Sequence, residues 1–179
     1  MVDPALGPFL FDTSAESWLA RTPLPQYERW FADYLSRHRA HVSGITVVER
    51  IRGYALLAQR VRAARAAEIE AARMAYLAAL GRVWPLDGAV GVVAGEIMAL
   101  LPSPPTPPRR ALRLVESRQD RLVRWRLDGI VAATALVADM PLIHNNAADF
   151  EAIRSAIERT PARFPGIGPL ALLRCDSLA

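Results

Sequence analysis

The stretch PFLFDTSA at residues 8–15 passes from an apolar run, through the acidic residue Asp12, into the start of a helix. It predicts a short buried strand, an acid and a helix in that order. The pattern recurs, because the apolar runs at residues 42–46 and 141–144 also precede helical segments. Strands that alternate with helices predict an α/β fold, with a central, mostly parallel sheet flanked by helices.

The other segments complete this alternation. One more strand is expected at residues 83–86, and residues 110–138 predict one long helix or two stacked ones. Helices are also expected at residues 25–39, 47–58, 63–80, 89–101 and 149–158. The charges of residues 63–80 have i,i+3 and i,i+4 spacing, which favours a solvated face: Arg65, Glu68, Glu70 and Arg73.

The length and the proline pattern indicate one domain. A chain of 179 residues that is 52% hydrophobic can bury a sizeable core, so we expect a single domain over residues 1–179. The segment PSPPTPP at residues 102–108 holds five prolines, which exclude a helix or a central strand. It is expected to be a stiff surface connection.

The composition excludes several classes of protein. A single cysteine, Cys175, excludes a disulfide framework and a cysteine-based zinc site, and it favours a reducing, cytoplasmic setting. The chain lacks about 18 consecutive apolar residues and the basic start of a signal peptide, so no membrane span or secretion is expected. A net charge of +4 and a pI near 10.0 favour a nucleic-acid partner, although all 22 basic residues are arginines, which a genomic bias also explains.

Three acids stand where parallel strands end, and ligand sites of α/β sheets form at that edge. Asp12 follows the first strand, Glu49 the second and Asp149 the last. Each has a structural alternative. Asp12 could cap the following helix, and the segments 46–49 and 146–149 match capping boxes.

Capping cannot explain Asp128, which lies at the edge of an apolar helical stripe. A salt bridge to Arg124 is its structural alternative. If the four acids converge, their mutual repulsion calls for a divalent cation, and Mg²⁺ or Mn²⁺ prefers oxygen ligands and serves phosphate chemistry.

Three stretches of the chain resemble the PIN-domain family, and within it the VapC-type toxins of bacterial toxin–antitoxin pairs. FLFDTS at residues 9–14 is similar to the family's opening strand with its first invariant Asp. ITVVERIRG at 45–53 is similar to its second motif. DGIVAATA at 128–135, followed by PLIHNNAADF at 141–150, is similar to the third and fourth motifs. The resemblance covers roughly residues 8 to 155.

This resemblance implies a PIN-like three-layer fold and a Mg²⁺- or Mn²⁺-dependent endoribonuclease that cleaves single-stranded RNA. It also implies a homodimer and inhibition by an antitoxin, and the alanine-rich faces of the helices after residue 46 and at 63–80 are plausible antitoxin grooves. The acidic site falls on Asp12, Glu49, Asp128 and Asp149. Asp12, Asp128 and Asp149 are the expected metal ligands, with Asp149 acting directly or through water, and Glu49 positions or deprotonates the attacking water. The supporting residues are Thr13, Ser14 and Asn146.

The sequence departs from the family pattern at three places. Ser14 replaces a common asparagine, His144 replaces the usual threonine, and the connection between residues 101 and 128 is long and rich in proline. We expect His144 to pack beside the site. The arginines of the connection could grip an RNA backbone or form a solvated face: Arg109, Arg110, Arg113, Arg118 and Arg121.

Two alternatives concern function and assignment. A haloacid-dehalogenase-like phosphatase needs a second Asp where Ser14 stands, so it is rejected. A non-catalytic PIN-like module that binds RNA or a partner stays open. The third motif could also be misassigned, because other acids stand near candidate site elements: Glu96, Glu116 and Asp120.

Overall fold

Five parallel strands form the central sheet of this computed structural model, which describes residues 2–108, 110–111 and 114–179. Their order across the sheet is β3-β2-β1-β6-β7. The bounds are β1 (Leu10–Phe11), β2 (Ala40–Ser43), β3 (Leu80–Trp84), β6 (Leu142–His144) and β7 (Leu172–Arg174). Two further short strands, β4 (Arg110–Ala111) and β5 (Leu114–Val115), pair separately as an antiparallel hairpin.

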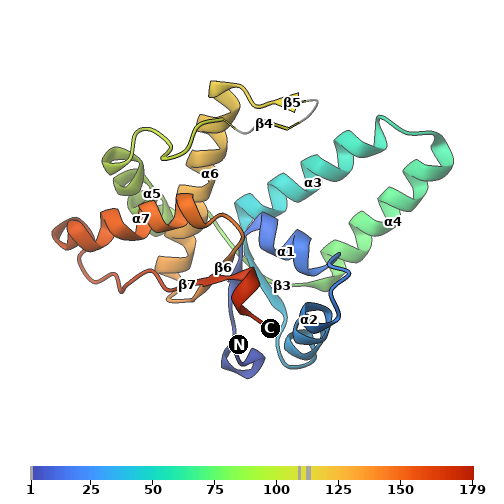
Figure 1. Cartoon of the computed structure of the whole chain (residues 1–179), viewed down its shortest axis with the longest axis horizontal. Helices are drawn as coiled ribbons and strands as arrows, with labels where there is room; N and C mark the ends of the chain where they lie inside the picture. Colours follow the sequence, from blue (N-terminus) through green and yellow to red (C-terminus); the bar gives the residue numbers. More distant parts are fainter. Residues whose placement is uncertain (1, 109, 112–113) are drawn as a thin grey trace.

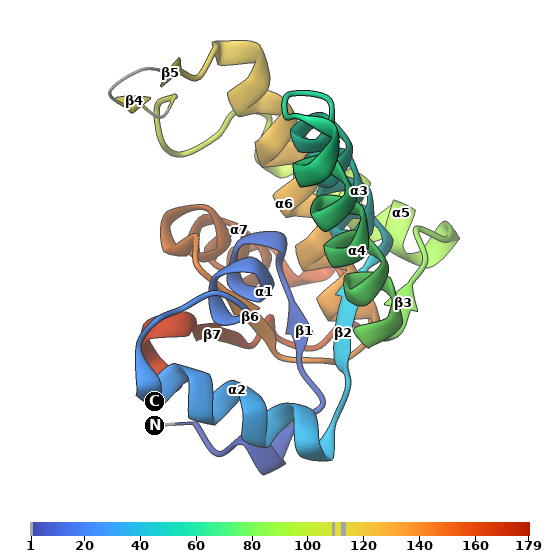
Figure 2. The same cartoon turned by 90° about the vertical axis from the view of Figure 1, so that its right-hand side faces the viewer.

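Helices cover both faces of this sheet (Figures 1 and 2). The helices α5, α6 and α7 pack over one face, whereas α1 and α2 pack over the other. The helices are α1 (Thr13–Leu19), α2 (Pro25–Arg37), α3 (Gly44–Ala58), α4 (Ala63–Ala79), α5 (Gly88–Leu100), α6 (Arg118–Val137) and α7 (Ala147–Arg159). None of the helices in the described ranges is long and apolar enough to cross a membrane.

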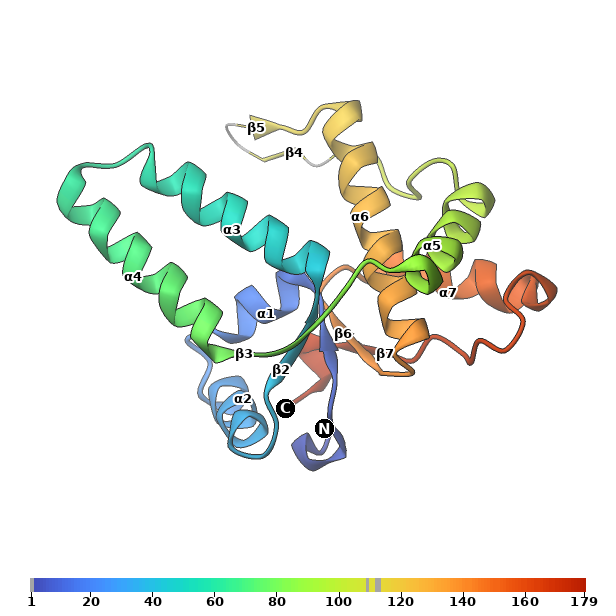
Figure 3. The ribbon, with the colours of Figure 1, turned by 180° about the vertical axis from the view of Figure 1, so that it is seen from behind.

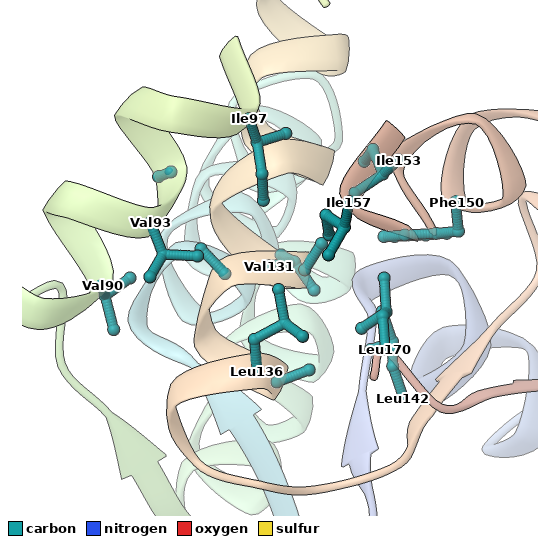
Figure 4. Close-up of a cluster of buried hydrophobic side chains, with 14 of the residues drawn as sticks. Val90, Val93, Ile97, Val131, Leu136, Leu142, Phe150, Ile153, Ile157 and Leu170 are labelled. Carbon is teal, nitrogen blue, oxygen red and sulfur yellow. The ribbon is translucent and has the colours of Figure 1, made fainter. Parts of the chain in front are cut away.

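The alternation of side chains along the strands divides the core in two. Leu10 and Leu142 point to the helices α5 to α7, while their neighbours Phe11 and Ile143 point to α1 and α2. All four are fully buried, as expected for strands covered on both faces. Figure 4 shows the first of these clusters, where side chains of α5, α6 and α7 meet Leu142. The three-layer arrangement predicted from the sequence is therefore present.

The helices α3 and α4 form an antiparallel pair that projects from the sheet (Figure 3). A cationic side chain anchors this pair to α1. The guanidinium of Arg50 on α3 forms an ion pair with Glu16 on α1, with 3.0 Å between Nε and Oε2. The same guanidinium lies over the rings of Tyr54 and Tyr76, so one residue ties α1, α3 and α4 together.

Most predicted elements are present, with four corrections. Strand β2 ends at Ser43, and Ser43 caps α3 by accepting a hydrogen bond from the Ile45 amide, so the strand at 42–46 was placed too late. Strand β3 occupies residues 80–84 instead of 83–86. The expected helix over 110–138 begins only at Arg118, because Ser117 caps it and the hairpin of β4 and β5 precedes it. The strand β7 was missed.

Candidate functional site

A cleft of about 550 Å³ opens where β1 and β6 end. Three of the four predicted acids line it: Asp12, Glu49 and Asp128. The fourth, Asp149, lies behind Asp128, and the two share Asn146, whose side-chain amide donates to both carboxylates at 3.1 and 2.6 Å. The topology thus brings the residue that follows β1 and residues of α3, α6 and α7 to one place.

Asp12 is buried and caps the helix that follows it. Its carboxylate accepts hydrogen bonds from the Ala15 amide at 2.5 Å and from the Ser14 hydroxyl at 2.9 Å. Burial raises the pKa of Asp12 to about 6, although the hydrogen bonds from Ala15, Ser14 and the Asn145 backbone oppose the rise. The negative charge of Glu49 adds to it. Asp12 therefore both caps α1 and lines the cleft.

Glu49 stands in the second turn of α3 and is half-buried. Its carboxylate accepts a hydrogen bond from the Thr13 hydroxyl at 2.5 Å, which links α3 to the start of α1. The predicted capping box of residues 46–49 is wrong. Ser43 is the cap, and Thr46 lies inside the helix, fully buried. Helix capping therefore does not explain why an acid stands at position 49.

Asp128 lies on α6 and faces the cleft. Burial raises its pKa well above the usual range, and the negative charges of Asp149 and Asp12 raise it further, while Arg124 lowers it. The ion pair proposed as its structural alternative is not the one that forms. The guanidinium of Arg124 instead grips Glu116 through two bonds of 2.9 Å and lies 3.5 Å from Asp149.

Asp149 is completely buried in the first turn of α7, and cations surround it. Arg121 donates to its Oδ1 at 2.6 Å, and Arg124 reaches Oδ2. The looser capping motif at 146–149 does not act as a cap, since the Asn146 side chain donates to acids instead of accepting from the backbone.

Arg121 corrects one expectation about the arginine-rich connection. Its side chain is 1% exposed, so it neither forms a solvated face nor reaches an RNA backbone. Besides Asp149, it donates to the backbone oxygen and the hydroxyl of Thr106 at 3.2 and 2.8 Å. It therefore pins the proline-rich segment, which contains neither helix nor strand, to α7. Arg109, Arg113 and the side chain of Arg110 lie outside the described part of the chain.

Sequence reasoning missed Arg121 and Arg124 as parts of the site. The signal was their spacing on α6. Residues 121, 124 and 128 are separated by three and four positions, which places them on one side of a helix. Two arginines on the same side of a helix as an acid indicate that their positive charges offset a buried carboxylate nearby.

The remaining candidates have structural roles. His144 is fully buried against the ring of Phe150, with 5.0 Å between ring centroids, and burial lowers its pKa to about 4. Glu96 pairs with Arg163 at 2.5 Å, and Asp120 accepts a hydrogen bond from the capping residue Ser117. Neither acid lines the cleft.

The donor set of the cleft suits a hard cation only in part. Among the described residues, no three His, Cys, Asp or Glu side chains lie close enough together to hold a metal ion. Asp12 and Asp128 nonetheless face one cleft, are both desolvated and repel each other. Mg²⁺ commonly binds through one or two carboxylates and keeps several waters, so these two acids fit it without a third ligand. Asp149 already has two guanidinium partners.

Comparisons with models of protein families and with curated proteins gave no match. Solved structures do match. A chain of FitAcB from Neisseria gonorrhoeae has a TM-score of 0.60 at 18% identity, over 95% of this chain and 99% of that one. A chain of VapBC2 from Rickettsia felis, bound to a DNA fragment from their promoter, has a TM-score of 0.59 at 14% identity, over 93% and 97%. DNA-bound VapBC from Salmonella typhimurium gives 0.55 at 20%, over 93% and 97%. At these identities the likeness is one of fold, and it confirms the PIN-like fold.

Burial of Asp12 makes the stability of the metal-free protein depend on pH. The pKa of this carboxyl rises from 3.8 to about 6 on folding, so the folded state binds the proton more tightly. The resulting stability is fully present below about pH 4 and is lost as the pH rises through about 6. We expect Asp12→Asn to raise the free energy of unfolding at about pH 7.5, by roughly 3 kcal/mol at most. Urea unfolding at about pH 3.5 should show no such gain, and a variant that is not stabilised at neutral pH would contradict the desolvation of Asp12.

A second prediction follows from the ion pair between Arg121 and Asp149. Arg121→Met removes the closer cation from a buried carboxylate and should lower the free energy of unfolding by about 3–5 kcal/mol. Arg65→Met, which breaks an exposed pair with Glu68, is the matched control and should cost less than about 1 kcal/mol. The double variant Arg121→Met, Asp149→Leu should recover part of the loss. Similar small losses for both single variants in urea unfolding would show that the buried pair is not a structural anchor.

Proposed function

We propose that this chain is a Mg²⁺- or Mn²⁺-dependent endoribonuclease that cleaves single-stranded RNA, and that it is the toxin of a toxin–antitoxin pair. One observation gives the main support for the proposed enzymatic activity. Two desolvated, mutually repelling carboxylates, Asp12 and Asp128, face an open cleft at the carboxyl end of a parallel sheet. Such a pair is costly for a folded protein, and a bound cation offsets the cost. The solved complexes of the same fold support the toxin part.

The acidic residues of the cleft would have different roles in the reaction. Asp12 and Asp128 would hold the cation, which supplies positive charge for the phosphoryl oxygens and lowers the pKa of water. Glu49, fixed by the Thr13 hydroxyl, is placed to take a proton from the attacking water. The water oxygen would then bond to phosphorus while the bond from phosphorus to one ribose oxygen breaks, and that ribose oxygen would leave with a proton taken from solvent.

We assign an indirect role to Asp149. Its carboxylate is engaged by Arg121, Arg124 and Asn146, and Asn146 in turn donates to Asp128. These contacts favour Asp149 as the residue that orients Asn146, and through it Asp128. Direct coordination of a metal by Asp149 stays a prediction from the family resemblance.

A partner surface is proposed on the helix pair. A groove of about 260 Å³ is lined by α1, α2, α3 and α4, and small side chains of α4 form one wall: Ala72, Ala75 and Ala79. Apolar side chains stand exposed beside it, including Leu35 at 43%. The VapBC and FitAcB structures of the same fold support a partner protein, and we propose that an antitoxin segment binds here. Dimerisation of this chain stays a prediction.

Cleavage of a labelled single-stranded RNA tests the enzymatic proposal. We expect cleavage with Mg²⁺ or Mn²⁺ and none in excess chelator. Asp12→Asn and Asp128→Asn should abolish it, and Glu49→Gln should slow it by about 10²- to 10⁴-fold. Asp149→Asn should lower the affinity for Mn²⁺, measured by calorimetry, less than Asp128→Asn does, because Asp149 acts on the cation through Asn146 and Asp128.

Asp33→Asn changes an exposed acid of α2 and is the matched control, with unchanged cleavage. Cleavage that persists in chelator, or in Asp12→Asn, would contradict the mechanism. Metal binding without any cleavage would favour the non-catalytic module.

Co-expression with the small protein encoded beside this chain tests the partner surface. The two should co-purify, and Ala75→Arg should break the complex by filling the groove with a bulky cation. Ala78→Arg adds the same charge to an exposed position of α4 outside the groove lining and should leave the complex intact. Equal retention of both variants would place the partner elsewhere.

A further inference from the structure

A second part of the cleft lining has a different chemistry from the acids. It is formed by the second half of α1 and the turn after it: Ser17, Trp18, Arg21, Thr22 and Pro23. Positions 14, 18 and 21 are separated by four and three residues, so they lie along one side of the helix. At about 1.5 Å per residue, Trp18 stands about 9 Å along α1 from Asp12. A nucleotide next to the bond being cut can span this distance.

Trp18 is half-buried and held in place. Its ring meets that of Tyr27 edge to face, with 4.9 Å between centroids and 68° between planes. The hydroxyl of Tyr27 donates to the backbone oxygen of Asp176 at 3.2 Å, which fixes the supporting ring. An aromatic ring that is fixed before binding loses little conformational entropy when a ligand stacks on it.

Arg21 supplies a cation beside this ring. Its guanidinium donates to the backbone oxygen of Ser17 at 2.9 Å and to the Ser17 hydroxyl. Within the described residues it takes part in no ion pair, in contrast to Arg50, Arg121 and Arg124. The nearby acid Glu16, whose pKa the charge of Arg21 lowers, has its ion pair with Arg50. The exposed guanidinium of Arg21 can therefore also contact an anion that enters the cleft.

The size of the cleft points to a ligand larger than an ion. Its volume of about 550 Å³ lies within the range of about 300–1,000 Å³ that is usual for clefts that bind small organic molecules. Acids at one end, and an aromatic ring with a cation at the other, match the parts of a nucleotide. We propose that Trp18 is the stacking platform for a base that flanks the scissile phosphate, and that Arg21 contacts the adjoining backbone phosphate. This proposal rests on the proposed function and names its substrate subsite.

Binding of a labelled single-stranded RNA to the Asp12→Asn protein, followed by fluorescence anisotropy, tests this subsite without cleavage. Trp18→Ala should weaken binding by about 5- to 150-fold, the usual effect of removing one stacking ring. Trp18→Phe keeps a ring and should stay within about threefold. A strand with the same phosphates but no bases should bind Trp18→Ala and its parent equally. Arg21→Gln should lower the salt dependence of log affinity by about 0.7.

The possible outcomes distinguish a failure of this subsite from a failure of the proposed function. Unchanged RNA affinity in Trp18→Ala, or an equal loss on the strand without bases, overturns the stacking role even if the unaltered chain cleaves RNA. RNA binding with the expected Trp18 effects, but without metal-dependent cleavage, supports the subsite and rejects the enzyme. An unaltered salt dependence in Arg21→Gln rejects the phosphate contact; this side chain is exposed and its hydrogen bonds within the described residues go to Ser17. A loss of stability in Trp18→Ala with intact RNA affinity assigns the ring to packing alone.

Discussion

The desolvation of two carboxylates is the constraint on which the site depends. Asp12 and Asp128 come from segments far apart in the chain, yet both lose water where β1 and β6 end. The negative charge of Asp12 raises the pKa of Asp128, and that of Glu49 raises the pKa of Asp12. A fold gains nothing in stability from this arrangement by itself. The surrounding donors make it tolerable: Ala15, Ser14 and Asn145 for Asp12, and Asn146 for Asp128. The acidic end of the cleft is thus supported from both layers of helices.

The sheet determines which residues can meet at that end. Because Leu10 and Phe11 point to opposite cores, the strand β1 is held on both faces, and the residue after it emerges at a defined position. The same holds for β6, whose end carries Asn145 and Asn146. The helices α3 and α6 bring Glu49 and Asp128 from the sides. The rigid element is the sheet, and α1 serves two surfaces at once, with Trp18 toward the cleft and Glu16 toward the groove.

Sequence patterns were sufficient for what depends on local order. The strand before Asp12, the helix at 63–80 and the parallel α/β arrangement follow from short apolar runs and helical spacing. Competition between local signals caused the errors. Ser43 took the cap that Thr46 was expected to provide, and Ser117 delayed α6. The strand β7 is three residues long and, in the described part of the chain, pairs with β6 alone, so nothing local predicted it. The partners of Arg121 lie 15 and 28 residues away, and no periodicity predicts such contacts.

The buried pair of Arg121 and Asp149 also affects how this protein can evolve. A substitution of either residue alone leaves the other charge uncompensated inside the protein, so an acceptable path must change both together or pass through a destabilised intermediate. Selection for folding alone would therefore keep both positions fixed over long periods, even in descendants that have lost all activity. An aspartate that is invariant among related sequences at this position can record the cost of burying an arginine, and its persistence does not by itself identify a participant in chemistry.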